Sequence, residues 1–550
     1  MYPTSPGGSY ALGKRPTATP RRNDTYNYDK FLFPPQVQQV QWTPRLVPRH
    51  RRPRQRSYNK EVVAVIIILL VASIVSISTA YVLLISSAPV DSRRSSPGFS
   101  QSGKAHSVIA ADSLSSDRPV VPGPSVKFLA YLPHSGFHNQ RIALENALVL
   151  AHLLNRTLLL PSVRLGVPLA YAPFDELYDM AANATKTGLE HCASTLHDRS
   201  DPTLECENYA SYTHIPWGWL IDLPAIQRMQ PLLPGWNFTD GWLQDNLNLS
   251  AGDIFTLKDE SRHQHAFQDF ITRRPPQRKF SEPIHLAALA HRPERLVMLG
   301  SLFGSSRLHL RSRENALVRR QVREKMVFTN PHLANVTDDI RAALGGTYLA
   351  VHLRIGDGSF EVNAPEIVRR SWWKLLRLGL GFSDEEIALL EEESFPEEDP
   401  SEPPIFAPDL PVLRSPHPPL SPFPSNASPA PGFSCRGLPH SAPRLKRLNA
   451  PLYISTDAIS PSLNPLLWRF LRTFPCSFFL EDFVEQTRPL GVLRSQMDGV
   501  PLGSFLMPFV DAMVAGQAYQ VVGTESSTFS AFVTDVLWRR YHGFKIVQRG

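Results

Sequence analysis

Apolar residues run from Tyr348 to Leu353 and are followed at once by polar side chains and glycines. The apolar run is rich in β-prone residues and predicts a buried parallel strand. His352, Arg354 and Asp357 then stand at its C-terminal end, which is where ligands bind in open α/β sheets. An edge strand with a surface arginine is the alternative interpretation. The strand's surroundings decide between the two.

An earlier part of the chain shows a strand, a loop, a helix and a second strand. We predict strands over 126–132 and 157–161 and a helix over 140–154, in which apolar residues recur at helical spacing. Asn139 stands where the helix N-cap belongs. A helix N-terminus favours an anion through its free N–H groups and its dipole, although many such loops bind nothing.

The C-terminal part repeats this kind of pattern. We predict a strand over 452–457, a helix over 509–517, a strand over 520–523 and a hydroxyl-rich turn that leads into a helix over 524–533. The hydroxyls of Ser526, Ser527 and Thr528 can cap that helix, and they can equally donate to phosphate oxygens. The predicted fold class is therefore α/β, with two units facing each other across a cleft at residues 125–345 and 346–550.

One long segment is hydrophobic throughout and shows no alternation of apolar and polar residues. Val62 to Ile85 contains no charged residue, and about 24 residues at a rise of about 1.5 Å each are enough to cross a bilayer. Arginines crowd its N-terminal flank, so the positive-inside rule places the N-terminus in the cytosol. We predict a disordered basic tail (1–60), a transmembrane signal-anchor helix (61–87), a flexible stalk (88–124) and a lumenal body.

Charge and proline content refine this organisation. The net charge is +7, but residues 1–60 hold twelve Lys and Arg against two Asp, which leaves about −3 for the rest. The basic character belongs to the tail and does not indicate a nucleic-acid-binding domain. Residues 396–443 hold 15 of the 51 prolines, which predicts a disordered insertion.

The four cysteines all follow the hydrophobic segment, which fits disulfides in an oxidising compartment. Cys192 with Cys206 closes a short loop and is the preferred pair, which leaves Cys435 with Cys476, although three connectivities are possible. Zinc ligation is disfavoured because no C-x-x-C spacing occurs. Glycosylation sequons lie on the same side, at Asn183, Asn237, Asn248, Asn335 and Asn426.

Three strand ends or helix starts thus carry groups that suit an anion, and one nucleotide diphosphate would explain all three. No D-x-D sequence occurs after the hydrophobic segment, so nothing indicates a metal-held diphosphate. Arginine's bidentate fork would then neutralise the leaving group. This points to metal-independent glycosyl transfer from a nucleotide sugar, with no cofactor.

Three motifs in this order resemble the GDP-fucose protein O-fucosyltransferase family, in particular a fungal-type, single-pass type II member. The first comprises Leu132-Pro-His-Ser-Gly-Phe-His-Asn-Gln140 and Leu154-Asn-Arg-Thr-Leu-Leu-Leu-Pro161. The second is His352-Leu-Arg354 with Asp357, and the third joins Asp511-Ala-Met-Val-Ala-Gly-Gln517 to Ser526-Ser-Thr-Phe-Ser-Ala-Phe-Val533. The resemblance covers roughly 126–165, 346–360 and 450–545.

The resemblance implies a GT-B fold of two Rossmann-like domains, GDP-fucose as donor, and inversion at the fucose carbon without metal. The N-terminal domain would take the acceptor and the C-terminal domain the nucleotide. Arg354 would be the catalytic residue that stabilises the diphosphate. The implied GDP-fucose-binding residues are Gly136, Asn139, His352, Asp357, Asp511 (facing the guanine), Ser527, Thr528 and Phe529.

The chain departs from the family at the general base. Some members carry a glutamate in the first loop, but here that loop reads Pro133-His-Ser-Gly136. Either His134 or His138 serves, or no strong base is used, or activity is lost. The acceptor, a protein Ser/Thr or a glycan, stays open, as does residence in the endoplasmic reticulum or the Golgi. Two other functions stay open: an inactive GDP-sugar-binding scaffold and a transferase for a different nucleotide sugar.

Overall fold

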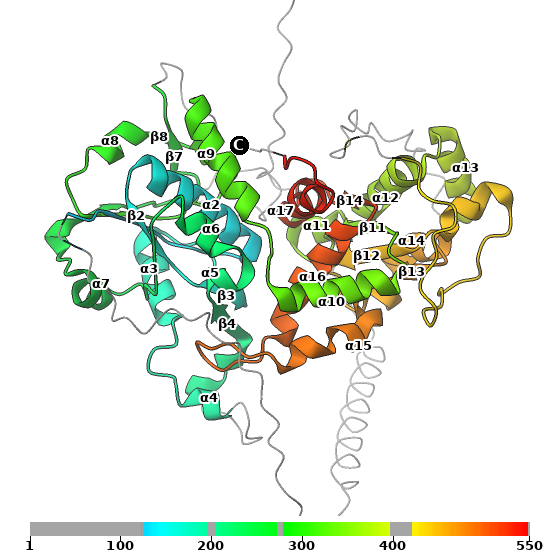
Figure 1. Cartoon of the computed structure of the whole chain (residues 1–550), viewed down its shortest axis with the longest axis horizontal. Helices are drawn as coiled ribbons and strands as arrows, with labels where there is room; N and C mark the ends of the chain where they lie inside the picture. Colours follow the sequence, from blue (N-terminus) through cyan, green and yellow to red (C-terminus); the bar gives the residue numbers. More distant parts are fainter. Residues whose placement is uncertain are drawn as a thin grey trace, which may run out of the picture. The chain divides into compact units, whose positions relative to one another are not determined.

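Parallel sheets, with helices packed against them, form the framework of the chain in this computed structural model (Figure 1). The structure describes residues 123, 125–195, 204–271, 279–395, 418 and 421–547. The predicted tail, transmembrane helix and nearly all of the stalk lie outside these residues. Within the described ranges, no helix has the length and hydrophobicity needed to cross a membrane.

The two larger sheets are fully parallel, as is the three-stranded sheet. The five-stranded sheet has the order β5 (Leu232–Pro234), β2 (Thr157–Leu160), β1 (Phe128–Tyr131), β9 (Leu296–Leu299), β6 (Ile254–Leu257). The four-stranded sheet has the order β13 (Ser477–Phe478), β12 (Leu452–Thr456), β11 (Leu349–Leu353), β14 (Gln520–Gly523). Smaller sheets join β10 (Leu308–His309), β7 (His265–Gln268) and β8 (Glu282–His285), and pair β3 (Val163–Gly166) with β4 (Tyr212–Ile215).

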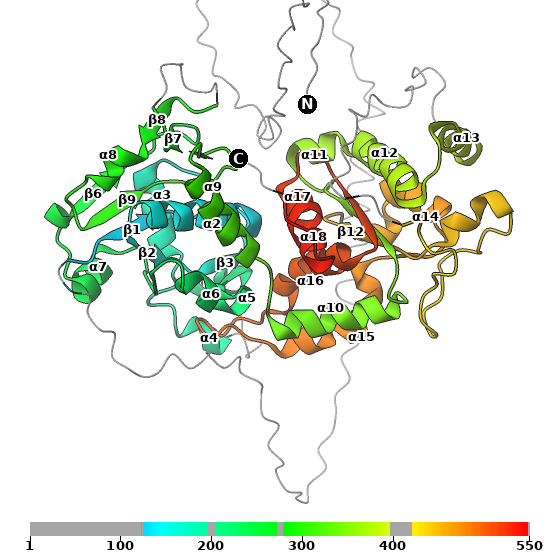
Figure 2. The same cartoon turned by 45° about the horizontal axis from the view of Figure 1, so that its top comes forward.

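Helices of the first half accompany the five-stranded sheet. They are α2 (Phe137–Leu153), α3 (Phe174–Asn183), α4 (Cys192–Thr195), α5 (Trp217–Leu220), α6 (Leu223–Gln227), α7 (Asp240–Leu247), α8 (Leu286–Ala290), α9 (Arg313–Lys325) and α10 (Pro331–Ala343). Helix α2 follows β1 directly and packs against both β1 and β2, as a crossover between parallel strands requires (Figure 2). Helix α9 packs along α2.

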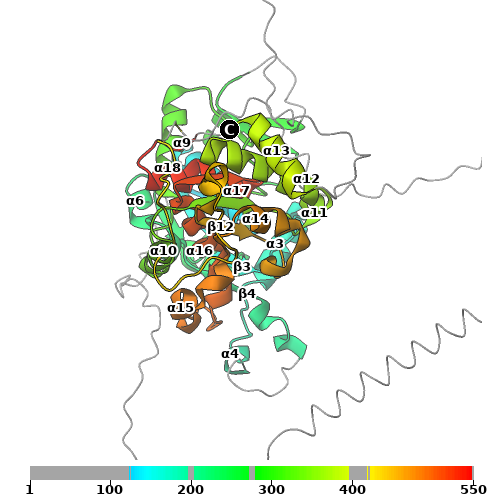
Figure 3. The same cartoon turned by 90° about the vertical axis from the view of Figure 1, so that its right-hand side faces the viewer.

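Helices of the second half are α11 (Gly358–Val362), α12 (Ala364–Lys374), α13 (Asp384–Ser394), α14 (Trp468–Thr473), α15 (Val484–Thr487), α16 (Gly503–Gln517), α17 (Thr528–Phe532) and α18 (Trp538–Tyr541). Helix α12 packs against β11 and α14, and α16 packs against β12 and α10. Figure 3 shows α12 beside α14.

The five-stranded and four-stranded sheets are buried on both faces, because alternate residues of each strand enter different cores. In β1, Leu129 and Tyr131 join one apolar cluster, while Phe128 and Ala130 join another. In β11, Ala350 joins the first of these clusters, while Leu349, Val351 and Leu353 join a third. This double burial explains the continuous apolar runs in the sequence.

The first of these clusters also draws residues from both halves of the chain. All described residues belong to one compact unit. The fold is thus mixed α/β with parallel sheets, and its division into two Rossmann-like domains stays a prediction.

The predicted pairing of the cysteines is confirmed, with disulfides Cys192–Cys206 and Cys435–Cys476. The predicted N-cap is wrong. Helix α2 begins at Phe137, two residues before Asn139, and its N-cap is the extended residue Gly136. The helix starts earlier than its aliphatic periodicity suggests because the ring of Phe137 packs against that of Phe509, with centroids 4.6 Å apart.

The predicted disordered insertion (396–443) needs a correction at its end. Residues 396–417 lie outside the described residues, but residues 421–443 pack against both halves. Phe433 stacks on Phe483 with ring centroids 5.6 Å apart, the Ala430 N–H bonds to the Ala343 carbonyl at 3.0 Å, and Cys435 is cross-linked. These contacts hold the proline-rich chain in place without regular elements.

Candidate functional site

Arg354 follows the C-terminal end of β11, and two groups fix its geometry. Its backbone N–H donates to the Thr524 hydroxyl at 2.9 Å. Its Nε and Nη2 donate to the two carboxylate oxygens of Asp357 at 3.0 and 2.7 Å. Among the described residues, none accepts a hydrogen bond from Nη1. Because the Asp357 side chain is 59% exposed, this ion pair holds the fork weakly enough for an anionic ligand to compete for it.

The turn after Arg354 is held by the neighbouring strand. One carboxylate oxygen of Asp457 accepts the N–H groups of Ile355 and Gly356 at 2.7 and 2.9 Å. A Cβ at Gly356 would lie 2.6 Å from the Asp457 carbonyl oxygen, so only glycine fits there. The sequence showed a polar end on this strand, but the role of Asp457 follows only from the parallel pairing of β11 with β12.

A pocket of about 530 Å³ opens at this edge of the four-stranded sheet. Of the predicted site residues it brings together His352, Arg354, Asp511 and Phe529. Its remaining lining comes from the ends of β12 and β13 and from α16, including Asp457, Phe479, Glu481 and Met507. The pocket therefore lies where the strand polarity predicts a ligand.

Asp511 reaches the pocket from α16. Its carboxylate accepts the Tyr453 hydroxyl at 2.6 Å and the Ser455 hydroxyl at 2.5 Å. Tyr453 and Ser455 are two residues apart on β12, so both face this helix. Desolvation raises the pKa of Asp511 to about 6, although the two hydroxyls partly offset this effect. Sequence reasoning singled out Asp511 but missed its two partners.

His352 is buried at the base of the pocket. Its Nδ1 lies 2.6 Å from the Ser530 hydroxyl, and its ring stacks on Phe529 with centroids 4.5 Å apart. Burial, with the charge of Arg354, lowers the pKa of His352 to about 3. The ring is therefore neutral at any physiological pH, and it positions Phe529 at the pocket wall.

The other predicted residues lie around this pocket without lining it. The Ser527 hydroxyl caps α17 by accepting the Ser530 N–H at 3.2 Å, so it has the capping role. Thr528 faces a separate cavity of about 80 Å³ that is also lined by Arg141 and Glu145. Gly136 and Asn139 are in or next to the first turn of α2 and are not among the pocket's lining residues.

The two candidate base histidines differ sharply. Both ring nitrogens of His134 lie 2.7 Å from hydroxyls, those of Ser135 and Ser301, and the residue lines a different cavity of about 180 Å³. His138 packs edge-on against Phe529, with centroids 4.4 Å apart, and its Nδ1 has no partner in the described part of the chain. Burial lowers the pKa of both histidines, so both are neutral.

Metal-ligating side chains gather elsewhere. Within the described ranges, His191, Cys192 and Cys206 place three possible metal ligands close enough together to bind one ion. None of these residues lines the pocket.

Fold and pocket together define an α/β protein with a pocket of charged and apolar residues at the carboxyl edge of a parallel sheet. A scan of known protein families finds no match. Among characterised proteins, O-fucosyltransferase 30 of Arabidopsis thaliana is 57% identical over 37 residues, a match that covers 7% of each chain.

Solved structures with partial likeness include POFUT1 in complex with GDP-fucose and POFUT1 in complex with GDP. The first has 10% identity and a TM-score of 0.32, covering 76% of this chain and 96% of that one. The second has 11% identity and the same TM-score, covering 78% of this chain and all of that one. A TM-score of 0.32 is too low to define a shared fold.

Proposed function

We propose that this chain is a metal-independent, inverting glycosyltransferase that moves fucose from GDP-fucose to a protein or glycan hydroxyl. The observation that carries the proposal is the pocket that joins Arg354 to Asp511 at the carboxyl edge of the four-stranded sheet. The short match to an O-fucosyltransferase and the three sequence motifs agree with it. We place the reaction in the lumen of the endoplasmic reticulum or the Golgi, behind the predicted signal anchor.

In this proposal the nucleotide base binds at Asp511. An ionised carboxylate can accept two parallel N–H groups, which is the donor pattern of guanine's Watson–Crick edge. The Tyr453 and Ser455 hydroxyls fix the two carboxylate oxygens, so the acceptor pair is aimed in advance. Adenine and uracil lack this pair of adjacent donors and would bind more weakly.

The diphosphate binds at Arg354. The acceptor oxygen attacks the anomeric carbon, the bond from that carbon to the phosphate oxygen breaks, and GDP leaves with an extra negative charge. The guanidinium fork can follow that charge by exchanging Asp357 for phosphate oxygens. The exchange costs little because the Asp357 pair is partly exposed.

Neither candidate base histidine lines the pocket, but one of them is better suited to take the acceptor proton. His138 is neutral and has an unpartnered Nδ1, whereas both nitrogens of His134 already contact hydroxyls. We therefore favour His138 as the base. Gly136 and Asn139 in the same turn would contact the donor from the opposite side.

Calorimetry of GDP and GDP-fucose binding to the full chain in detergent, with a chelator present, tests the proposal. Arg354→Ala should weaken binding by about 10- to 100-fold, because a hydrogen bond to a charged group contributes about 1.5–3 kcal/mol. Arg444→Ala is the matched control, since Arg444 also donates to both oxygens of a carboxylate, Glu393, but does not line the pocket.

Asp511→Asn should reduce the preference for GDP over UDP without abolishing binding. Equal affinity of the wild type and Arg354→Ala would refute the diphosphate site. Binding without any turnover of GDP-fucose would favour the inactive scaffold. Binding that disappears with the chelator would refute metal independence.

A further inference from the structure

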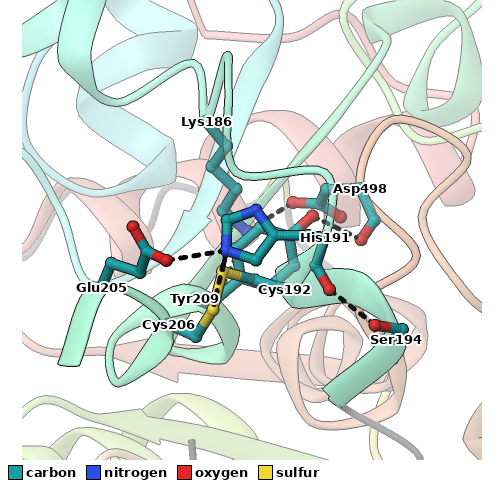
Figure 4. Close-up of a disulfide and its surroundings, with 8 residues drawn as sticks. All are labelled: Lys186, His191, Cys192, Ser194, Glu205, Cys206, Tyr209 and Asp498. Atoms are coloured by element: carbon teal, nitrogen blue, oxygen red, sulfur yellow. Dashed lines mark hydrogen bonds and ion pairs between the residues drawn. A yellow bond between two sulfur atoms is a disulfide. The ribbon is translucent and has the colours of Figure 1, made fainter. Parts of the chain in front are cut away.

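His191, Glu205 and the Cys192–Cys206 disulfide meet at the junction of α4 with the short helix η2 (Leu204–Cys206) (Figure 4). The His191 Nε2 lies 3.6 Å from the Cys192 sulfur and 3.7 Å from the Cys206 sulfur. The same nitrogen lies 3.0 Å from a carboxylate oxygen of Glu205. The His191 nitrogen and the two sulfurs thus lie within 4.8 Å of one another, and Glu205 contacts the same nitrogen.

The nitrogen–sulfur separations match those of a tetrahedral zinc site. With Zn–S bonds of about 2.3 Å and Zn–N and Zn–O bonds of about 2.0–2.2 Å, tetrahedral angles put sulfur and nitrogen about 3.6 Å apart. Nitrogen and oxygen would be about 3.4 Å apart and the two sulfurs about 3.8 Å apart. The imidazole is therefore already at zinc distance from both sulfurs. Zinc binding would require the two sulfurs to separate and the exposed Glu205 side chain to turn toward them.

Access and charge also suit a cation. The His191 and Glu205 side chains are 51% and 59% exposed, so an ion can enter from solvent. Both cysteines are buried, which shields the sulfurs from competing water. Four protein ligands without an open position would make a structural site.

The surrounding structure holds the site independently of the disulfide. Lys186, five residues before His191, donates to the Asp498 carboxylate at 2.6 Å and to the backbone carbonyls of Tyr209 and Tyr212 at 2.7 Å each. The Tyr209 hydroxyl donates to the Asp498 carbonyl oxygen at 3.0 Å. Lys186, Tyr209 and Asp498 lie beside the disulfide (Figure 4), and none of their contacts passes through the bond between the sulfurs.

We propose that the reduced chain binds one Zn²⁺ through the two cysteine sulfurs, the His191 Nε2 and a Glu205 carboxylate oxygen. A dithiol reductant gives two electrons and two protons to the disulfide and becomes a cyclic disulfide itself. The two thiols then release two protons as Zn²⁺ binds, and the His191 ring proton resides on Nδ1. The segment is therefore closed by a covalent bond in one redox state and by a metal ion in the other.

The second disulfide provides an internal comparison. In the described part of the chain, no third ligand atom lies within 4.8 Å of both sulfurs of Cys435–Cys476. Two thiols alone do not form a structural zinc site. Any zinc bound after full reduction is therefore assigned to the first pair.

The test is a zinc titration of the full chain in its oxidised state and after reduction with a phosphine. A phosphine is used because a dithiol would compete with the protein for zinc. Competition with a chromophoric chelator gives the affinity. We expect one zinc per reduced chain and none per oxidised chain. Cobalt in place of zinc should give the intense visible bands of a tetrahedral site and sulfur-to-cobalt charge transfer.

His191→Ala should weaken zinc binding by at least about 100-fold, the upper end of the cost of losing an outer-shell partner. Its side chain is exposed, and a thermal melt of the oxidised variant checks that the fold is intact. The double variant Cys435→Ser with Cys476→Ser should keep the full affinity. Three results would each overturn the proposal: equal affinity in His191→Ala, zinc bound equally by the oxidised chain, or the weak bands of octahedral cobalt.

Discussion

Lys186→Met tests the physical reasoning most directly. The Lys186 and Asp498 side chains are 3% and 5% exposed, and their charged atoms are 2.6 Å apart (Figure 4). At an effective dielectric constant of about 20, two charges at this distance attract by about 6 kcal/mol. Desolvation of both ions offsets part of that attraction.

Methionine has nearly the same shape but leaves the Asp498 carboxylate buried without its cation. It also removes the donor from the carbonyls of Tyr209 and Tyr212. We expect the free energy of unfolding to fall by about 3–5 kcal/mol, as when one partner of a buried pair is removed. The Thr213 hydroxyl, 2.7 Å from Asp498, is too weak a donor to compensate.

Urea denaturation followed by tryptophan fluorescence measures the change, and Asp498→Asn completes a double-mutant cycle. Lys258→Met is the matched control. It breaks another Lys–Asp pair at 2.7 Å, but those side chains are 49% and 73% exposed, so at most about 1 kcal/mol should be lost. A loss under about 1 kcal/mol in Lys186→Met, or single-variant losses that simply add, would refute the reasoning.

Three further predictions concern the pocket and the buried titratable groups. Gly356→Ala should destabilise the chain by about 1–3 kcal/mol and weaken GDP binding, because the added Cβ meets the Asp457 carbonyl and displaces Arg354. An unchanged affinity for GDP in calorimetry would contradict this prediction. The pKa of Asp511 is raised from 3.8 to about 6, so ionisation of its carboxyl costs stability above pH 6. As the pH falls from 6 to 4, the free energy of unfolding of the wild type should therefore rise by up to about 3 kcal/mol relative to that of Asp511→Asn. Denaturation at each pH measures this difference. Burial lowers the pKa of His134 from 6.5 to about 3, so its contribution to stability is complete above pH 6.5 and is lost as the pH drops toward 3. His134→Gln should lose less stability over this pH range than the wild type. An unchanged dependence of stability on pH would contradict the prediction.

The sequence by itself determined most of the local structure. The strands at 349–353, 452–456 and 520–523 are mostly apolar because both faces of each are buried, and their few polar residues lie at or near the strand ends. Sequence also placed the polar residues at the strand ends, and the short loop between Cys192 and Cys206 favoured their pairing.

Only the tertiary structure decided which of these residues meet. The register of β11 beside β12 places Asp457 at the turn after Arg354, and the packing of α16 on β12 gives Asp511 its two hydroxyl partners. Local spacing, which counted against zinc, could not show that the His191 ring contacts both sulfurs of one disulfide. Residues far apart in a chain become neighbours through strand pairing and core packing. Those interactions depend on the whole fold, and no local pattern of residues encodes them.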